Sequence, residues 1–145
     1  MTLPHTVTVY NVVTTTASTY EETTENNITI LRGVLVDEVK GRNVRESGLV
    51  GADAVTLHIP REIEAVAPDG TEKQYLDPVA YWAAADKTAY WTLSVDNGTF
   101  FVKGEVVEPT ASEEAINLAH DGVYTVTKVD NKDFGGLPHW EVGGA

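Results

Sequence analysis

The sequence predicts a mainly β protein: a small antiparallel β-barrel or sandwich with long loops and one short helix at about residues 111–120. Runs rich in valine, threonine and aromatic residues recur along the chain, and these residue types suit a pleated, half-buried surface. The strand-like runs are short, they outnumber the helical ones, and turn-forming residues separate them at close intervals. This combination favours a barrel or a sandwich.

The first part of the chain predicts two strands. Thr6–Thr16 is rich in threonine and valine and predicts the first of them. Thr19–Asn27 is polar and contains three glutamates, so we expect it to be an exposed loop. Asn27–Asp37 predicts the second strand, in which Gly33 marks a bulge or a close approach of two backbones.

Two connections are candidate interface loops. Lys40–Gly51 has three glycines and three cations within a very acidic chain, so it is either an ordinary solvated loop or a contact loop for an acidic partner surface. Arg61–Pro78 contains the turn signals Pro-Asp-Gly and Asp-Pro, and a long loop in a compact domain is often functional. The candidate interface residues are Lys40, Arg42, Asn43, Arg45, Arg61, Asp69 and Lys73.

A third strand is predicted between these loops, at Asp53–Pro60. The run alternates, so that Val55, Leu57 and Ile59 share one face while His58 lies on the other. Proline ends the strand because it has no N–H to donate to a ladder. We expect His58 to be a surface histidine.

The middle of the chain predicts a β-hairpin. Val79–Ala85 is either a short helix or a buried turn. Tyr90–Asp96 and Thr99–Val107 are then joined by Asn97-Gly98, and Asn-Gly between two β-like runs is a strong hairpin signal because both residues tolerate positive φ.

The last part predicts a helix and two closing strands. Thr110 and Glu113 have the spacing of a capping box, and Asp121-Gly122 supplies the left-handed residue that ends a helix. Gly122–Asp130 and Leu137–Val142 then predict a hairpin, with Asn131–Gly136 as its loop. The residues to which we assign structural roles in turns or the core are Trp91, Asn97, Gly98 and Trp140.

Length and composition restrict the class of protein. A chain of 145 residues suggests one domain, residues 1–145, and the lack of cysteine excludes disulfides and thiol catalysis. The N-terminal stretch lacks the pattern of a signal peptide, and no run is long and apolar enough to predict a membrane span. The net charge of −12 is the reverse of the basic footprint that nucleic-acid binders need.

Motifs that suggest chemistry lack the context that the chemistry requires. Asp133-Phe134-Gly135 resembles a kinase metal-binding triplet, but no glycine-rich phosphate loop or catalytic loop accompanies it. Asp130–Asp133 fails the spacing of a calcium loop because Lys132 occupies a ligand position. The histidines His5, His58, His120 and His139 are far apart in the sequence. We therefore predict no catalytic residue, no metal site and no cofactor, and expect the chain not to be an enzyme.

The order of several motifs resembles a known class of proteins. They are GVLVDEVKGRNVRESGLVGADAVTLHIP, YLDPVAYW, YWTLSVDNGTFFVKGEVV, a short helix and VYTVTKVDNKDFGGLPHWEVG, which together span roughly residues 28 to 143. In this order they resemble small structural proteins of the head and head–tail joining region of tailed phages and prophages of Gram-positive bacteria. These proteins are described as minor capsid or head–tail connector proteins.

The resemblance implies a connector-like β domain without catalytic residues. Such connectors form rings under the portal, commonly twelve-fold, and bind portal or adaptor proteins on one side and tail-completion proteins on the other. DNA passes nearby without sequence-specific binding, and no membrane is involved. The implied location is the neck or head of the virion, assembled in the cytoplasm of the bacterial host. A minor capsid or capsid-decoration protein is the alternative.

A ring built from one chain needs two different surfaces on each subunit. We expect the loops to supply these surfaces, and we expect Thr6–Thr16 and Leu137–Val142, as edge strands, to pair across subunits. The acidity of the chain suits the wall of a DNA channel, because negative charge repels the phosphates.

Overall fold

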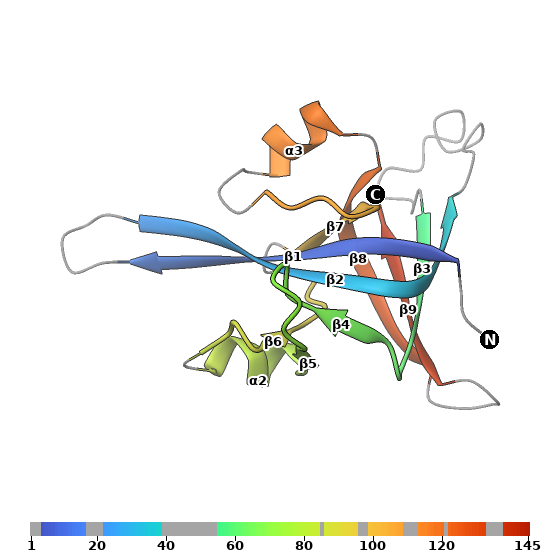
Figure 1. The fold of residues 1–145 in the computed structure, drawn as a ribbon, viewed down its shortest axis with the longest axis horizontal. Coiled ribbons are helices and arrows are strands. Elements are labelled where there is room, and N and C mark those ends of the chain that lie inside the picture. The colour runs from blue at the N-terminus through green and yellow to red at the C-terminus, as the bar shows by residue number, and fades with distance from the viewer. Residues whose placement is uncertain are drawn as a thin grey trace.

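The protein is described by a computed structural model over residues 4–16, 22–38, 55–84, 86–95, 99–108, 113–120, 122–132 and 138–145. It is mainly β, as predicted, with two short helices (Figure 1). The strands are β1 (His5–Thr16), β2 (Glu22–Glu38), β3 (Val55–Pro60), β4 (Glu64–Val66), β5 (Gln74–Tyr75), β6 (Tyr90–Trp91), β7 (Thr99–Lys103), β8 (Val123–Lys132) and β9 (His139–Gly144). The helices are α2 (Pro78–Ala83) and α3 (Glu113–Ala119).

Six strands form a closed antiparallel barrel, so of the two predicted architectures the barrel is correct. The strand order is β1-β7-β8-β9-β3-β2, and the pairing of β2 with β1 closes the circle. Each of these pairings is antiparallel. β4 pairs with β2 outside the circle, and β5 and β6 form a separate two-stranded parallel sheet beside α2 (Figure 1).

The long strand β2 turns the corner of the barrel at Gly33. The register against β1 shifts there, because His5 pairs with Val34 and the next residue, Thr6, pairs with Arg32. Gly33 is thus the extra residue of a β-bulge, and its φ of 96° is one that glycine adopts without a steric penalty. The predicted bulge is confirmed. Beyond it, β2 leaves β1 and pairs with β3.

The barrel interior is the main hydrophobic core. The alternation predicted for the third strand is confirmed, because Val55, Leu57 and Ile59 are fully buried while the residues between them are half-buried. The predicted core aromatics Trp91 and Trp140 are both buried. The other buried residues of this core are Val7, Val9, Leu31, Val34, Val36, Ala65, Leu93, Phe101, Val126 and Val142.

A second core lies on the outside of the barrel, beneath α3. Tyr10, Ile28 and Phe100 come from neighbouring strands and point outward, and Ile116 of α3 is buried against them. The predicted helix is therefore present. Ile116 is the residue that it buries, whereas Leu118 is 83% exposed. Its start at Thr110 lies outside the described residues.

Two loop and turn predictions are wrong. Thr19–Asn27 was expected to be a loop, yet from Glu22 onward the chain is strand, because β1 offers it a continuous antiparallel partner. The hairpin around Asn97-Gly98 was expected to pair the segments on either side, but β6 pairs with β5, and β7 pairs with β1 and β8. β7 also ends at Lys103 instead of Val107. Asn97 and Gly98 themselves lie outside the described residues.

Two further expectations need correction. β9 is not an edge strand, because it pairs with both β3 and β8, and β1 is not one over residues 7–11, which pair with both β2 and β7. The connection Arg61–Pro78 is not a plain loop, since it contains β4 and β5. Of the two alternatives left open for Val79–Ala85, the short helix is confirmed, because α2 covers Pro78–Ala83; it is a second short helix beside the predicted one. The predicted closing hairpin is confirmed by the pairing of β8 with β9.

Candidate functional site

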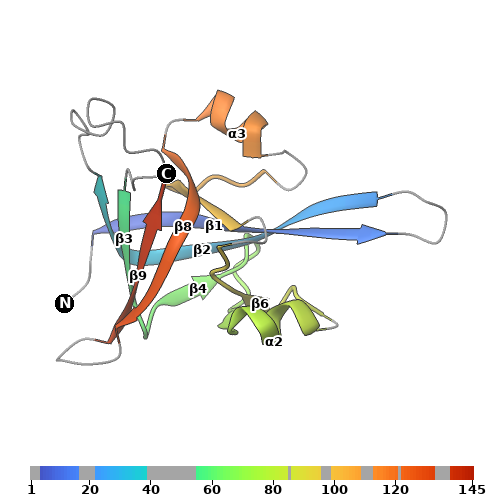
Figure 2. The ribbon, with the colours of Figure 1, turned by 180° about the vertical axis from the view of Figure 1, so that it is seen from behind.

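A two-stranded arm projects from the barrel and is its most extended feature (Figures 1 and 2). We define the arm as residues 12–16 of β1 and 22–26 of β2. The pairing of β1 with β7 ends at Asn11 and Thr99, whereas the pairing of β1 with β2 continues to Thr16 and Glu22. Among the described residues, no third strand pairs with the arm. The outer edges of these described strands are therefore candidates for pairing with another chain.

Two asparagines, directly opposite each other, form the root of the arm. Asn11 and Asn27 are Cα partners at the last position before the strands leave the barrel. Asn11 is fully buried; its amide donates to the carbonyl of Thr92 at 2.9 Å and to Oγ1 of Thr99 at 3.1 Å. Its oxygen accepts from the backbone N–H of Thr92 at 3.2 Å. Asn11 thus ties the barrel end to the segment that follows β6.

Asn27 makes the matching connection on the other strand. Its amide nitrogen lies 2.7 Å from the hydroxyl of Tyr81, 2.7 Å from the carbonyl of Lys87 and 3.1 Å from the carbonyl of Tyr90. Its oxygen accepts a hydrogen bond from Nζ of Lys73 at 2.8 Å. A buried polar network of this kind fixes one arrangement when its members are satisfied. The network therefore holds the root of the arm against α2 and the segment that leads into β6.

Lys73 is the buried cation of this network. Only 6% of its surface is exposed, and besides Asn27 it donates to the carbonyl of Ile28 at 3.1 Å. Removal from water disfavours the charged form, so burial lowers the pKa of the Lys73 ammonium from 10.5 to about 8. Lys73 was expected on an exposed interface loop, but it is instead an internal connection between β2 and the β4–β5 segment.

Helix α2 supplies the hydroxyl of the network. It begins at Pro78, where the fixed φ of proline suits the first turn, and Tyr81 donates its backbone N–H to the carbonyl of Asp77 at 2.9 Å. Tyr81 is fully buried, and this burial raises the pKa of its phenol. The helix is therefore anchored at one residue, while Val79 is 86% exposed.

An open groove lies beside the aromatic end of the core. Tyr75 packs on Trp91 and Trp140, with ring centroids 5.0 Å and 4.5 Å apart respectively, and the guanidinium of Arg61 lies 4.6 Å above the Trp140 ring. The groove encloses about 470 Å³ and is lined by Tyr75, Asp77, Pro78, Leu93, Ser94, Val95, Val129, Asn131 and Trp140. Its mixed apolar and polar lining suits a side chain or short segment of a protein partner.

The predicted interface residues have different positions. Arg61 is half-buried against Trp140, and Asp69 is exposed in a turn, where its carboxylate accepts from the N–H of Thr71 at 2.9 Å. This hydrogen bond and a second one from Thr71 lower the pKa of Asp69. The residues Lys40, Arg42, Asn43 and Arg45 lie outside the described part of the chain.

Sequence reasoning missed one group of potential metal ligands. His58, His139 and Glu141 come together on the outer face of β3 and β9, with ligand atoms that all lie within 4.8 Å of one another. The two histidines are 81 positions apart in the sequence, and only the pairing of β3 with β9 makes them neighbours. The group could have been predicted only by assuming that these two strands pair in antiparallel fashion, because that pairing places His58 opposite Glu141.

Comparison with known proteins gives one match. A family model described as a family of unknown function, DUF6751, matches residues 1–145. No curated protein and no solved structure matches the chain. Among the described residues, no helix is long and apolar enough to cross a membrane.

Proposed function

The chain belongs to DUF6751, a family of unknown function, and from its residues we propose that it is a structural subunit of the head–tail junction of a tailed phage or prophage. In this proposal, copies of the chain form a ring, with a dodecamer as the expected size, between the portal or adaptor and the tail-completion proteins. The subunits line or close the channel through which DNA passes. The role requires no catalysis.

The arm is the observation on which this proposal rests. A ring of identical subunits needs an element on one subunit that reaches a different surface of the next. The arm extends beyond the barrel, and its root is held by the buried network of Asn11, Asn27 and Lys73. A hairpin whose root is held by such contacts, and whose described residues pair with no third strand, is suited to adding strands to a neighbour.

The charge of the chain supports the same role. With 22 acidic and 10 basic residues, the net charge is −12. A strongly negative channel wall repels the phosphates of DNA, so that the DNA slides without adhering. The cations in the Lys40–Gly51 segment are candidates for docking on an acidic neighbour, where they would contribute mainly orientation.

Labelling the protein in assembled particles tests the proposal. The gene of the chain, fused to a small epitope tag, is expressed during phage assembly, and antibody-bound gold is located by electron microscopy. We expect label at the neck, at about a dozen copies per particle. Label spread over the capsid at hundreds of copies would overturn the junction role and support the alternative, a minor capsid or capsid-decoration protein. Absence from purified particles would contradict both roles.

A further inference from the structure

The geometry points to a divalent-cation site, suited to zinc, formed by His58, His139 and Glu141 on the outer wall of the barrel. The inference concerns the isolated chain and does not depend on the role in phage assembly. It also departs from the prediction from the sequence, which found no metal-binding spacing among the histidines. The described residues hold this one group of three potential ligands with converging ligand atoms.

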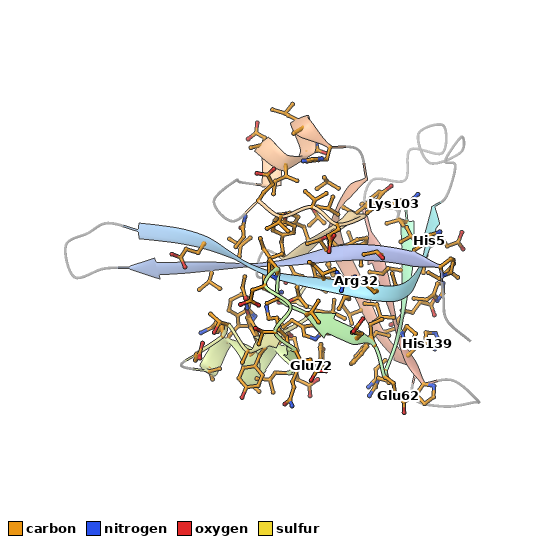
Figure 3. The ribbon with its side chains drawn as sticks, in the orientation of Figure 1. His5, Arg32, Glu62, Glu72, Lys103 and His139 are labelled. Atoms are coloured by element: carbon orange, nitrogen blue, oxygen red, sulfur yellow. The ribbon has the colours of Figure 1, made fainter. Side chains whose placement is uncertain are left out.

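The strand pairing places all three side chains on one surface. His58 of β3 is the Cα partner of Glu141 of β9, so their side chains point to the same side of the sheet. His139 lies two residues before Glu141 and therefore shares its face, whereas Trp140 and Val142 point into the core. The buried residues thus fix the direction of the two potential ligands on β9. Figure 3 shows His139 on the part of the barrel away from the arm.

The distances require only a small rearrangement. The ligand atoms lie within 4.8 Å of one another, and the imidazole rings of His58 and His139 have centroids 5.8 Å apart at an angle of 45°. In a tetrahedral zinc site with bonds of about 2.0–2.2 Å, ligand atoms are about 3.4 Å apart. Binding of one ion would require the half-buried side chains to rotate so that these distances shorten.

The chemistry of the three groups matches zinc better than magnesium or calcium. Two imidazoles and one carboxylate form a mixed nitrogen and oxygen set that suits zinc, whereas magnesium and calcium prefer sets of oxygen atoms. The neighbouring positions on β8 carry both signs of charge: Asp130 lies opposite Glu141 and Lys132 opposite His139. Nζ of Lys128 lies 3.4 Å from the carboxylate of Asp130. Three protein ligands leave a fourth position for water or a group from another molecule.

Zinc titration of the full-length chain tests the site. The chain is purified without a histidine tag, dialysed against a chelator and then titrated with zinc chloride by calorimetry, in competition with a chromophoric chelator. We expect one ion per chain with micromolar affinity or better, and an increase of the melting temperature on binding. His139→Ala and Glu141→Gln should each weaken the affinity by at least about tenfold.

His120→Ala is the matched control. His120 and Glu108 form a histidine–glutamate pair with 3.8 Å between Nε2 and Oε1, and no third potential ligand joins them within the part of the chain that the structure describes. The control should bind zinc as the wild type does. In a second measurement, the imidazole NMR signals of His58 and His139 should shift on addition of zinc while those of His120 do not.

The site would be overturned by two results. The first is a wild-type chain that binds no zinc, or that binds several ions weakly and loses affinity equally in His139→Ala and His120→Ala. Weak binding of several ions would indicate non-specific attraction to an acidic surface. The second is zinc-dependent NMR shifts that are confined to histidines other than His58 and His139. Both experiments use the purified chain, so a negative result would reject the zinc site without bearing on the role in the phage particle. A negative result in the particle-labelling experiment would likewise leave the zinc site untouched.

Discussion

At the scale of single residues, Lys73 and Asn27 show how the fold uses polar groups in its interior. Lys73, which is 6% exposed, is tolerated in the interior because an amide oxygen and a carbonyl oxygen accept hydrogen bonds from its amino group at 2.8 Å and 3.1 Å. These contacts do not fully replace water, and burial therefore lowers the pKa of Lys73. The cost depends on pH and is therefore testable.

Stability should increase with pH in the window in which Lys73 loses its proton. The folded pKa is about 8 and the ordinary value is 10.5, so between these values the unfolded chain holds a proton that the folded chain has released. Folding therefore gains free energy as pH rises through this window. Relative to Lys73→Met, the wild-type free energy of unfolding should increase by about 1–3 kcal/mol from about pH 7.5 to about pH 10.

Urea denaturation of both proteins at several pH values measures this difference. Burial raises the pKa of Tyr10 to about 12 and also raises that of Tyr81, which lowers stability at high pH, but both proteins contain these tyrosines. Their effect therefore cancels in the comparison. A difference between wild type and variant that is constant across the range would show that Lys73 titrates normally.

Some residue roles were predictable and others were not. The burial of Trp91 and Trp140 followed from their size and apolar character. The burial of Lys73 did not, because its partners Asn27 and Ile28 are more than forty positions earlier and belong to a segment partly predicted as a loop. A charged residue between turn signals is normally exposed. Only the tertiary structure reverses that expectation.

At the scale of elements, strand existence was easier to predict than strand pairing. Alternation and composition identified β1, β3, β8 and β9 to within a few residues. The Asn-Gly signal at positions 97 and 98 gave the wrong partners, because β7 finds long neighbours in β1 and β8 whereas β6 is only Tyr90–Trp91. The same limitation concealed the group of His58, His139 and Glu141. Local signals do not encode which distant strand will be adjacent.

The end of β9 offers a test of how tightly the barrel wall packs. A Cβ atom on Gly144 would lie 2.9 Å from Cζ of Phe101, Cβ of Tyr124 and Cγ1 of Val55. Atoms at that distance overlap, and they belong to three different strands, so none moves without disturbing a pairing. Gly144→Ala should lower the free energy of unfolding by about 1–3 kcal/mol. Urea denaturation followed by tryptophan fluorescence measures the change.

Glu114→Ala is the control for this variant, because Glu114 is exposed on α3. It should change stability by less than about 0.5 kcal/mol. If Gly144→Ala were as stable as the control, the strands around Gly144 would have to separate easily, and the wall would be less tightly packed than the distances indicate.

At the scale of the whole molecule, the barrel and the arm are separable parts. The barrel strands have partners on both sides, whereas arm residues beyond Asn11 pair only with each other among the described strands. A two-stranded hairpin is marginally stable by itself, so the arm contributes little to the stability of the barrel. Its length is better explained by contact with another molecule, and this view makes a clear prediction.

Removal of the arm should leave the barrel folded and prevent particle assembly. In the variant, residues 13–25 are replaced by Asn-Gly, which joins the paired residues Val12 and Asn26 by a two-residue turn. We expect near-wild-type circular dichroism and a free energy of unfolding within about 1 kcal/mol of the wild type. In phage assembly, heads and tails should accumulate separately.

Lys128→Ala, on the barrel wall, is the control in the assembly experiment and should support normal particles. Its exposed ion pair with Asp130 contributes little to stability. Normal assembly with the arm-deleted variant would show that the arm is dispensable in the particle. An unfolded arm-deleted variant would show that the two parts are not separable.

The position of β9 in the barrel has a consequence for biosynthesis. This strand lies between β3 and β8, so the circle stays open until the chain has been made as far as Gly144. The nascent polypeptide emerging from the ribosome therefore displays unsatisfied sheet edges along β3 and, later, β8. Closure of the barrel therefore has to wait for β9, and chaperones that shield such edges would act on this protein before β9 is in place.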